Sequence, residues 1–310
     1  MLVQVKDLEK VARGASDEKA HRFLIDYARG TREHFHDENS VALTDDNDAP
    51  TIIALLRGPS VFAIARNNSG YKRIAEDLFH ERIDCDPAWP TPGIKEDWEK
   101  HMLGKGLWTN ASPLVMWEFM EDAGFEKDLN DEHFRHAYLW VVEGEPQYAD
   151  LVQHPCRLGE GEELWQELRQ GIHYDPEGEY IKMCLQRGPS FVCEVGGKKV
   201  CWANTHLSGT MGMIYTPPEF RRMGYAKSLA AFQVDHMLHE FGVACGHVVS
   251  TNIASQGLMM SLNARRINEP LVWRSMYWPG EAAKAKARHD ALMAEKAEKD
   301  KDAAKKQGED

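Results

Sequence analysis

The segment PPEFRRMGYAKSL, residues 217–229, combines residue types that hold an anion. Arg221 and Arg222 carry positive charge, and the small residues Gly224 and Ala226 precede an amphipathic pattern. The first turn of a helix has N–H groups without internal partners, and the positive end of the helix dipole lies there. Small side chains let a pyrophosphate approach that backbone closely. The segment therefore predicts a diphosphate-binding loop; a plain strand-to-helix turn is the alternative.

The surrounding sequence predicts the elements that would present this loop. Period-2 alternation indicates strands, and the spacing of Leu229, Val234 and Met237 indicates a helix that ends at Gly242. Three antiparallel strands, a helix, a strand, a helix and a strand make a mixed α/β sheet. The expected strands are 190–195, 198–207, 210–216, 244–250 and 269–278, and the expected helices are 163–172, 177–185, 226–241 and 253–264.

The first half of the chain is less regular. Residues 1–36 and most of 94–141 are predicted to be helical, and 49–65 reads as a helix end or strand, a turn at Gly58-Pro59, and a strand. The tetrapeptide RGPS occurs at 57–60 and again at 187–190, each time before a strand. Chance would explain the repeat. A duplicated fold whose first copy has lost the loop would also explain it, and we slightly favour that hypothesis.

Composition limits the classes of partner. The chain has 310 residues and a formal net charge of −12, so nucleic acid and membrane surfaces are not expected partners. No apolar run is long enough to span a bilayer, and the N-terminus becomes polar too early for a signal peptide. The cysteines form no C-x-x-C pair, so we expect no metal and a cytoplasmic, disulfide-free protein. They are Cys85, Cys156, Cys184, Cys193, Cys201 and Cys245.

The motif R-x-x-G-x-A between a strand and a helix resembles the coenzyme A loop of the GCN5-related N-acetyltransferase (GNAT) superfamily. More narrowly, the sequence from Gly188 to Trp278 resembles the C-terminal domain of glycine N-acyltransferase-like enzymes. The matching segments are GPSFV (188–192), VCWANTHLSG (200–209), MGMIYTPPEFRRMGYA (211–226), NIAS (252–255) and PLVWRSMYW (270–278).

The resemblance implies a fold and a domain organisation. The fold class would be a mixed, mainly antiparallel GNAT-type sheet flanked by helices, with two tandem halves as a hypothesis. Residues 1–150 would form an N-terminal α/β domain, 160–280 the acyl-CoA-binding catalytic domain, and 281–310 a charged, solvated helical tail that frays into disorder.

The resemblance also implies how acyl-CoA would be held. The backbone of the loop would grip the pyrophosphate, and the edge of strand 210–215 would pair with the pantetheine arm. Gly212 in that strand suggests a bulge, and strand 244–249 would diverge from it. Asn252 and Ser255 would lie beside the pantetheine arm at the start of the next helix, and helix capping is their alternative role. The expected cofactor-binding residues are Met213, Ile214, Tyr215, Arg221, Arg222, Met223, Gly224, Tyr225, Ala226, Asn252 and Ser255.

The catalytic groups are where the chain departs from the pattern. The related enzymes carry a Glu directly after the glycine that matches Gly209, and Thr210 stands there in this chain. His206 is the candidate base and Glu194 the alternative. Backbone N–H groups of Met213 or Ile214 are the candidate oxyanion donors. The family's tyrosine acid is replaced by Met259, so Tyr215 or water would protonate the leaving thiolate.

The resemblance favours a CoA-dependent N-acyltransferase. It would move an acyl group from acetyl-CoA or another acyl-CoA to a small primary amine, such as an amino acid, by direct attack in a ternary complex. A non-catalytic acyl-CoA-binding module is the alternative, and acetylation of a protein or peptide is a third possibility. The sequence leaves open the acyl chain length, the acceptor and the oligomeric state.

Overall fold

The structure is a computed structural model of the 310-residue chain. It describes residues 1–6, 10–11, 40–57, 60–80, 83–84, 106–109, 114–127, 129, 135–145, 147–171, 178–206, 209–267 and 271–307. Most of the helix expected over 1–36, the turn at Gly58-Pro59, and Cys85 lie outside these ranges. The five described cysteines are free thiols.

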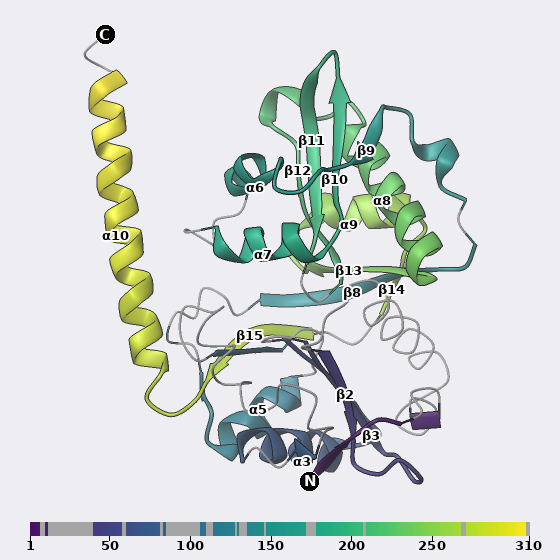
Figure 1. Cartoon of the computed structure of the whole chain (residues 1–310), viewed down its shortest axis with the longest axis vertical. Helices are drawn as coiled ribbons and strands as arrows, with labels where there is room; N and C mark the ends of the chain where they lie inside the picture. The colour runs from purple at the N-terminus through teal and green to yellow at the C-terminus, as the bar shows by residue number, and fades with distance from the viewer. Residues whose placement is uncertain are drawn as a thin grey trace.

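One sheet runs through both halves of the molecule (Figure 1). Its strands follow the order β5-β1-β2-β3-β4-β6-β15-β8-β13-β12-β11-β10-β9, and β7 and β14 pair beside this path. Most neighbouring strands are antiparallel, so the expected mixed α/β fold is confirmed.

In the N-terminal half, three antiparallel strands lead into a helix; the two-residue strand β5 follows, and then β6, which is parallel to β4. A second helix and a short strand follow. The elements are β1 (Leu2–Gln4), β2 (Ser40–Thr44), β3 (Ile52–Arg57), β4 (Ser60–Ala65), α3 (Asn68–Phe79), β5 (Ile83–Asp84), β6 (Gly106–Thr109), α5 (Leu114–Ala123), β7 (Glu126–Lys127) and β8 (Arg135–Glu143).

The C-terminal half repeats this order. Antiparallel β10, β11 and β12 lead into α8, and the next strand, β13, is parallel to β12. The elements are β9 (Cys156–Leu158), α6 (Trp165–Gly171), α7 (Glu179–Arg187), β10 (Ser190–Val195), β11 (Lys198–Thr205), β12 (Met211–Tyr215), α8 (Tyr225–Phe241), β13 (Val243–Val249), α9 (Ile253–Ser261), β14 (Arg265–Arg266), β15 (Leu271–Tyr277) and the tail helix α10 (Ala282–Gln307). Two tandem halves are thus present.

The two halves exchange their last strands. Strand β8 ends the N-terminal half in sequence, yet it pairs with β13 along seven residues of that strand and with β14. Strand β15 ends the C-terminal half, yet it pairs with β6 and β7. The exchanged strands lie side by side at the centre of the molecule, where they also pair with each other (Figure 1). The predicted domain boundary near residue 150 therefore does not separate the two sets of paired strands.

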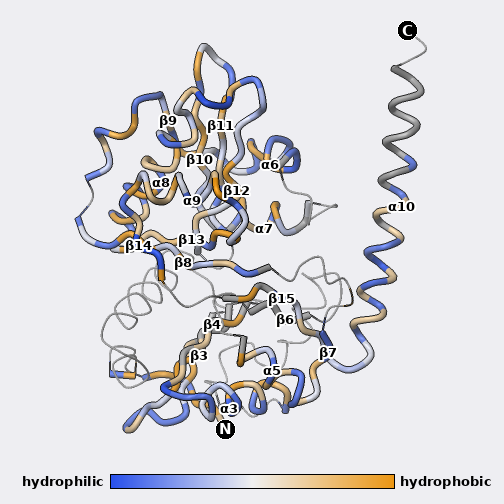
Figure 2. Tube along the Cα trace, turned by 180° about the vertical axis from the view of Figure 1, so that it is seen from behind, coloured by the Kyte–Doolittle hydropathy of each residue, from blue (hydrophilic) through white to orange (hydrophobic). Residues whose placement is uncertain are grey.

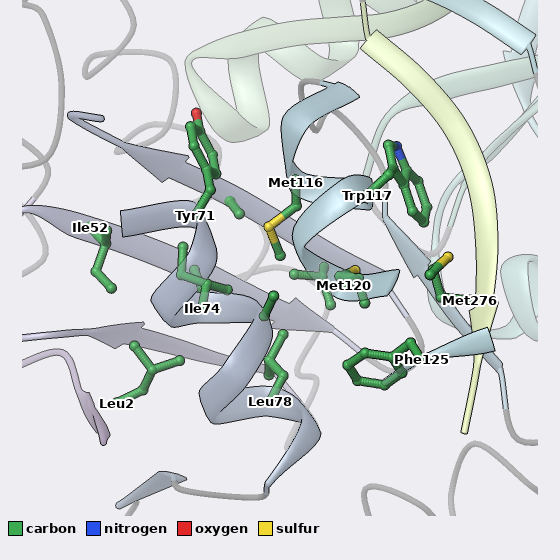
Figure 3. Close-up of a cluster of buried hydrophobic side chains, with 14 of the residues drawn as sticks. Leu2, Ile52, Tyr71, Ile74, Leu78, Met116, Trp117, Met120, Phe125 and Met276 are labelled. Atoms are coloured by element: carbon green, nitrogen blue, oxygen red, sulfur yellow. The ribbon is translucent and has the colours of Figure 1, made fainter. Parts of the chain in front are cut away.

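Strand β15 packs into the core of the N-terminal half. Helices α3 and α5 pack on the sheet, and Met276 of β15 faces the same buried cluster (Figure 3). The indole N–H of Trp117 donates a hydrogen bond of 2.9 Å to the Val272 carbonyl. Phe125 and Trp278 pack edge to face with their ring centroids 5.0 Å apart. Such aromatic pairs stabilise by about 0.5–1.5 kcal/mol beyond their buried area.

Two hydrophobic layers enclose the sheet of the C-terminal half. Helices α6 and α7 cover one face, where Trp202 and Val192 are buried. Helix α8 covers the other face through Leu229, beside Phe191 and Cys201. The strands accordingly carry mostly apolar residues, whereas the tip of the β10–β11 hairpin is hydrophilic (Figure 2).

Several expectations for the N-terminal half are wrong. Residues 2–4 form strand β1 instead of helix, and residues 106–109 and 135–143 form β6 and β8. Long-range strand pairing overrode local helical patterns in each case. The two RGPS segments also occupy non-equivalent positions, because the first joins β3 to β4 and the second precedes β10. The two halves share an order of elements, but this tetrapeptide does not mark equivalent positions in them.

The tail forms the single helix α10, which extends away from the body of the molecule (Figure 1). The start of this helix packs against the body, where Glu281, Ala282 and Ala285 are buried. Within the described ranges, every helix is too short or too polar to span a lipid bilayer.

Candidate functional site

The loop that precedes α8 has an unusual backbone. Strand β12 ends at Tyr215, a short 3-10 turn covers Pro218–Phe220, and α8 begins at Tyr225. Arg222 and Gly224 both have positive φ angles, 67° and 84°. Glycine adopts this conformation at no cost, whereas an arginine must be held there by its surroundings. Alternating backbone conformations of this kind turn successive N–H groups toward one point.

In the described part of the chain, the N–H groups at the end of this loop make no hydrogen bond. Among the described residues, no acceptor lies within hydrogen-bonding distance of the backbone N–H groups of residues 222–226. The loop is fixed from the other side: His154 Nε2 lies 3.0 Å from the Met223 carbonyl oxygen, and the His154 ring packs 4.5 Å from the ring of Tyr225. The loop is therefore held in shape while its donors stay free.

Charge at the loop is positive, in contrast to the net charge of the chain. Arg221, Arg222 and Lys227 are all exposed. The Arg221 Nε donates 2.9 Å to the Thr216 carbonyl, and its guanidinium lies 5.7 Å from the centre of the Tyr215 ring. Free backbone donors, the positive end of a helix and nearby cations together form a site for a polyanion such as a diphosphate.

Strand β12 carries the expected irregularity. The register between β11 and β12 shifts between the pairs Trp202–Tyr215 and Asn204–Gly212, and Met213 has a φ of 54°. Two residues of β12 thus oppose one residue of β11, which is the definition of a β-bulge. The bulge turns the backbone of Met213 and Ile214 away from regular pairing with β11.

Strands β12 and β13 touch at one point and then diverge. The only residue pair that joins them in the described chain is Met211 with Gly246, whereas β13 pairs fully with β8 on its other side. A side chain at Gly246 would bring its Cβ to 3.2 Å from the Met211 carbonyl oxygen. Glycine therefore permits the close contact at this point. Beyond it, the edge of β12 from Gly212 to Tyr215 remains unpaired with β13.

His206 lies beside this divergence. It follows β11 in the turn toward β12, where its N–H donates 2.9 Å to the Thr210 carbonyl. Its Nδ1 lies 3.0 Å from the Tyr180 hydroxyl, which α7 supplies. Its Nε2 lies over Gly212, since a Cβ built there would stand only 2.1 Å from that nitrogen. The imidazole is thus oriented by Tyr180 and occupies space that any larger residue at 212 would fill.

A second histidine completes this polar group. His247 lies on β13, next to the contact point at Gly246. Burial lowers the pKa of His206 to about 4. Burial, and to a lesser extent the neighbouring His206, lowers the pKa of His247 to about 3. Both rings are therefore neutral at pH 7, which leaves an imidazole lone pair to accept a proton.

The remaining predicted site residues are only partly brought together. Glu194 lies near the hairpin end of β10 and pairs with Arg157 at 3.1 Å, so the structure does not bring it to His206. Tyr215 packs against Trp202 at the loop end of β12, three residues from Gly212 along the strand. A strand rises about 3.3 Å per residue, so Tyr215 is roughly 10 Å from the His206 group.

The start of α9 has a structural role. The Asn252 side chain caps the helix by accepting from the Ser255 N–H at 3.0 Å. Capping, the alternative considered from the sequence, is thus observed for Asn252, whereas Ser255 contributes only its backbone N–H. Met259 is 4% exposed within the core under β13, where it cannot act as an acid.

Sequence reasoning missed Tyr180, His247 and His154. Tyr180 and His154 reach the site from α7 and from the segment before β9, far from the loop in sequence. His247 reads as one residue of a buried apolar strand. A single tyrosine or histidine in the sequence does not indicate that it belongs to a site, because the sequence does not reveal which strands are neighbours.

Comparison with known proteins supports the class of fold. Residues 193–273 match the family model described as FR47-like protein, which supports the GNAT superfamily for this part of the chain. That segment contains the bulged strand, the loop and both diverging strands. Closeness to glycine N-acyltransferases stays a prediction. A search of curated proteins found no match.

A solved structure shares the fold of most of the chain. An X-ray structure of a Drosophila protein has a TM-score of 0.53 at 14% identity, and the alignment covers 88% of this chain and 94% of that one. This likeness shows a shared fold across both halves. A putative GNAT-family acetyltransferase from Novosphingobium aromaticivorans has a TM-score of 0.41 at 14% identity, with 74% and 88% of the two chains covered. A tandem GNAT protein from the clavulanic acid biosynthesis pathway has a TM-score of 0.40 at 12% identity, with 91% and 98% covered.

Proposed function

We propose that the protein is an N-acyltransferase that uses acetyl-CoA or another acyl-CoA and acts on a small primary amine. The observation that carries this proposal is the loop at 221–226, with free N–H groups and exposed cations directly beside two diverging strands. A diphosphate on the loop and a thioester between β12 and β13 would use both features at once. The FR47-like match over the same residues supports this combination.

The pantetheine arm would lie along the unpaired edge of β12. Its amides would hydrogen-bond to the strand backbone in the manner of an added strand. The bulge at Met213 and Ile214 would then direct a backbone N–H to the thioester carbonyl, where it stabilises the oxyanion of the tetrahedral intermediate. These assignments are proposals, as is the amino acid acceptor expected from the sequence.

His206 is the proposed base. If its Nδ1–H donates to the Tyr180 hydroxyl, Nε2 carries the lone pair on the side of Gly212 and the diverging strands. The amine nitrogen attacks the thioester carbon, Nε2 takes the amine proton, and the C–S bond breaks as the carbonyl reforms. Tyr215 lies too far along β12 to protonate the thiolate beside His206, so the protonated imidazole or water would supply that proton.

A non-catalytic acyl-CoA-binding module remains the second candidate, because the site lacks the acidic residue that the related enzymes carry. The test is a thiol-release assay with acetyl-CoA and a panel of amines, run together with calorimetry of CoA binding. Amine-dependent release supports the enzyme. Binding without release for every amine favours the module, and absence of binding refutes both.

A further inference from the structure

Three cysteine thiols form a row under the loop. Cys193 on β10 lies directly opposite Cys156 on β9 and opposite Cys201 on β11. All three belong to the hydrophobic cluster that α8 covers, together with Tyr225 and Ala226 from the start of that helix. The proposed transfer reaction uses none of these thiols.

The Cys156–Cys193 pair has the arrangement that a disulfide needs. The Glu194 N–H donates 3.0 Å to the Pro155 carbonyl, so those two residues form a hydrogen-bonded pair. Hydrogen-bonded and non-hydrogen-bonded pairs alternate along an antiparallel ladder. Cys156 and Cys193 are therefore a non-hydrogen-bonded pair, with Cα atoms about 4.5 Å apart and side chains close together. Disulfides join Cα atoms roughly 4.4–6.8 Å apart.

The same reasoning separates Cys201 from this pair. The Thr205 N–H donates 3.2 Å to the Pro189 carbonyl, which makes Cys193 and Cys201 a hydrogen-bonded pair with side chains farther apart. The Cys201 sulfur accepts a hydrogen bond of 3.1 Å from the Thr216 hydroxyl, and burial raises the pKa of Cys201 to about 12. Cys201 is therefore held as a neutral thiol.

The two members of the pair differ in exposure. Cys156 is partly exposed, whereas Cys193 is fully buried. A hydrogen bond from the Cys156 thiol lowers the pKa of Cys193, so the pair retains one proton between two sulfurs when it ionises. An oxidant from solvent would meet the pair on the side of Cys156.

Cys156 is also linked to the loop through the chain. His154, two residues earlier, holds the Met223 carbonyl at 3.0 Å. The same ring nitrogen is the nearest atom, at 3.4 Å, to a Cβ built on Gly224. A shift of β9 relative to β10 would therefore move the residue that fixes the loop.

We propose that Cys156 and Cys193 are a thiol pair that a hydroperoxide oxidises to a disulfide, and that this bond weakens acyl-CoA binding at the loop. The second half of the proposal rests on the proposed function. In the singly ionised pair, the Cys156 thiol passes its proton to Cys193 while its sulfur attacks hydrogen peroxide; the O–O bond breaks, and a Cys156 sulfenic acid and hydroxide form. The Cys193 sulfur then attacks the Cys156 sulfur, the S–O bond breaks, and the departing hydroxide takes the remaining thiol proton as water. Two thiols lose two electrons, and the peroxide gains them.

Weakening follows from the change in distance. The Cα separation of about 4.5 Å lies at the short end of the disulfide range, whose most common value is about 5.5–6 Å, so the bonded pair relaxes by moving β9 away from β10. His154 moves with β9 and loses its contact to the Met223 carbonyl. The loss of one hydrogen bond that orders the loop corresponds to about a fivefold to tenfold increase in Kd.

The first test is chemical. The full chain is treated with hydrogen peroxide, and intact mass and non-reducing peptide maps are recorded. We expect the loss of two hydrogen masses and a cross-linked peptide that joins Cys156 to Cys193. The Cys156→Ser variant should give no cross-link, and the matched control Cys245→Ser, on β13, should behave as the unmodified protein. Any other oxidation product without this cross-link would overturn the proposal.

The second test measures binding. S-ethyl-CoA is titrated by calorimetry, because this thioether has no free thiol to reduce the disulfide. We expect weaker binding after oxidation, recovery with dithiothreitol, and no effect of peroxide on Cys156→Ser. Equal affinity before and after cross-linking would refute the coupling to the loop. No binding by the reduced protein would refute the proposed function and the coupling with it, whereas the cross-link result would stand by itself.

Discussion

The two halves of the molecule follow the same order of elements but begin their central helices differently. Between β4 and α3 the chain has only residues 66–67, and the Asn67 side chain accepts the Gly70 N–H at 3.1 Å. A Cβ on Gly70 would stand 2.6 Å from atoms of Ala65 and Ile52, so that helix is pressed against the sheet. The corresponding connection before α8 spans residues 216–224, and among the described residues nothing accepts from the N–H groups of 222–226.

This difference explains why one half is expected to bind a ligand and the other to support it. Free backbone donors at a helix start are stable when water or a ligand accepts from them. In α3 the Asn67 side chain itself accepts from the Gly70 N–H, and Gly70 lies close against the sheet. The N-terminal half also lends β8 to the sheet that carries the loop. Five predictions, in order of decreasing effect, test this division of roles.

The exchanged strand should decide whether the C-terminal half folds alone. A fragment of residues 135–267 contains β8 and can complete the sheet beside β13. A fragment of residues 150–267 leaves β13 as an exposed edge of seven residues. We expect the first to fold cooperatively and the second to aggregate or remain unfolded. Circular dichroism with thermal melting compares them, and equal melts would show that β8 is dispensable.

A carboxylate in the loop should abolish CoA binding. Gly224→Glu places a negative side chain at a positive φ and beside the free N–H groups, so we expect no binding in calorimetry. The matched control is Ser69→Glu, in the first turn of α3, where an acid should leave CoA affinity unchanged. Unchanged affinity in Gly224→Glu would remove the loop from the site.

Loss of the histidine should slow transfer without preventing binding. General bases contribute about 100-fold to 10,000-fold in rate, so we expect His206→Ala to lower kcat at least 100-fold with CoA affinity retained. Tyr180→Phe keeps the ring but removes the hydroxyl that orients His206, and a smaller loss is expected. The N-terminal half carries Arg57 to Ser60 at the corresponding turn, with no histidine. A fully active His206→Ala would identify another base.

The buried histidines should make the C-terminal half sensitive to acid. The folded-state pKa of His206 is lowered to about 4 and that of His247 to about 3. Below the unfolded value of about 6.5, the unfolded chain therefore binds protons that the folded chain does not. The contribution of these two histidines to the free energy of unfolding is fully present above about pH 6.5 and is lost as the pH decreases toward 4. Urea midpoints between pH 7 and 4.5 measure this fall, and His206→Gln with His247→Gln should reduce it.

The N-cap of helix α3, in the N-terminal half, should affect stability and not ligand binding. Asn67→Ala removes the acceptor of the Gly70 N–H, and loss of such a cap costs about 1 kcal/mol. We expect a lower urea midpoint and unchanged S-ethyl-CoA affinity. A change in affinity would show that α3 does take part in the ligand site.

Local features of the C-terminal half could be predicted because they depend on near neighbours. Period-2 alternation identified β10, β11 and β12, and helical spacing up to Gly242 identified α8. The motif from Arg221 to Ala226 identified the loop, since its glycine and small residue are requirements of that local backbone. Predictions for the N-terminal half were less accurate, because the short strands β1 and β6 form by pairing with strands that are distant in sequence.

The amino-acid sequence determined the elements of the C-terminal half and the chemistry of one loop, because hydrophobic period and backbone requirements act over a few residues. Only the tertiary structure decided that β8 and β15 change places, that His206 lies over Gly212 beside Tyr180, and that Cys156 lies opposite Cys193. Strand pairing and register join residues that are far apart in the chain, and the alternation within a strand does not name its partner.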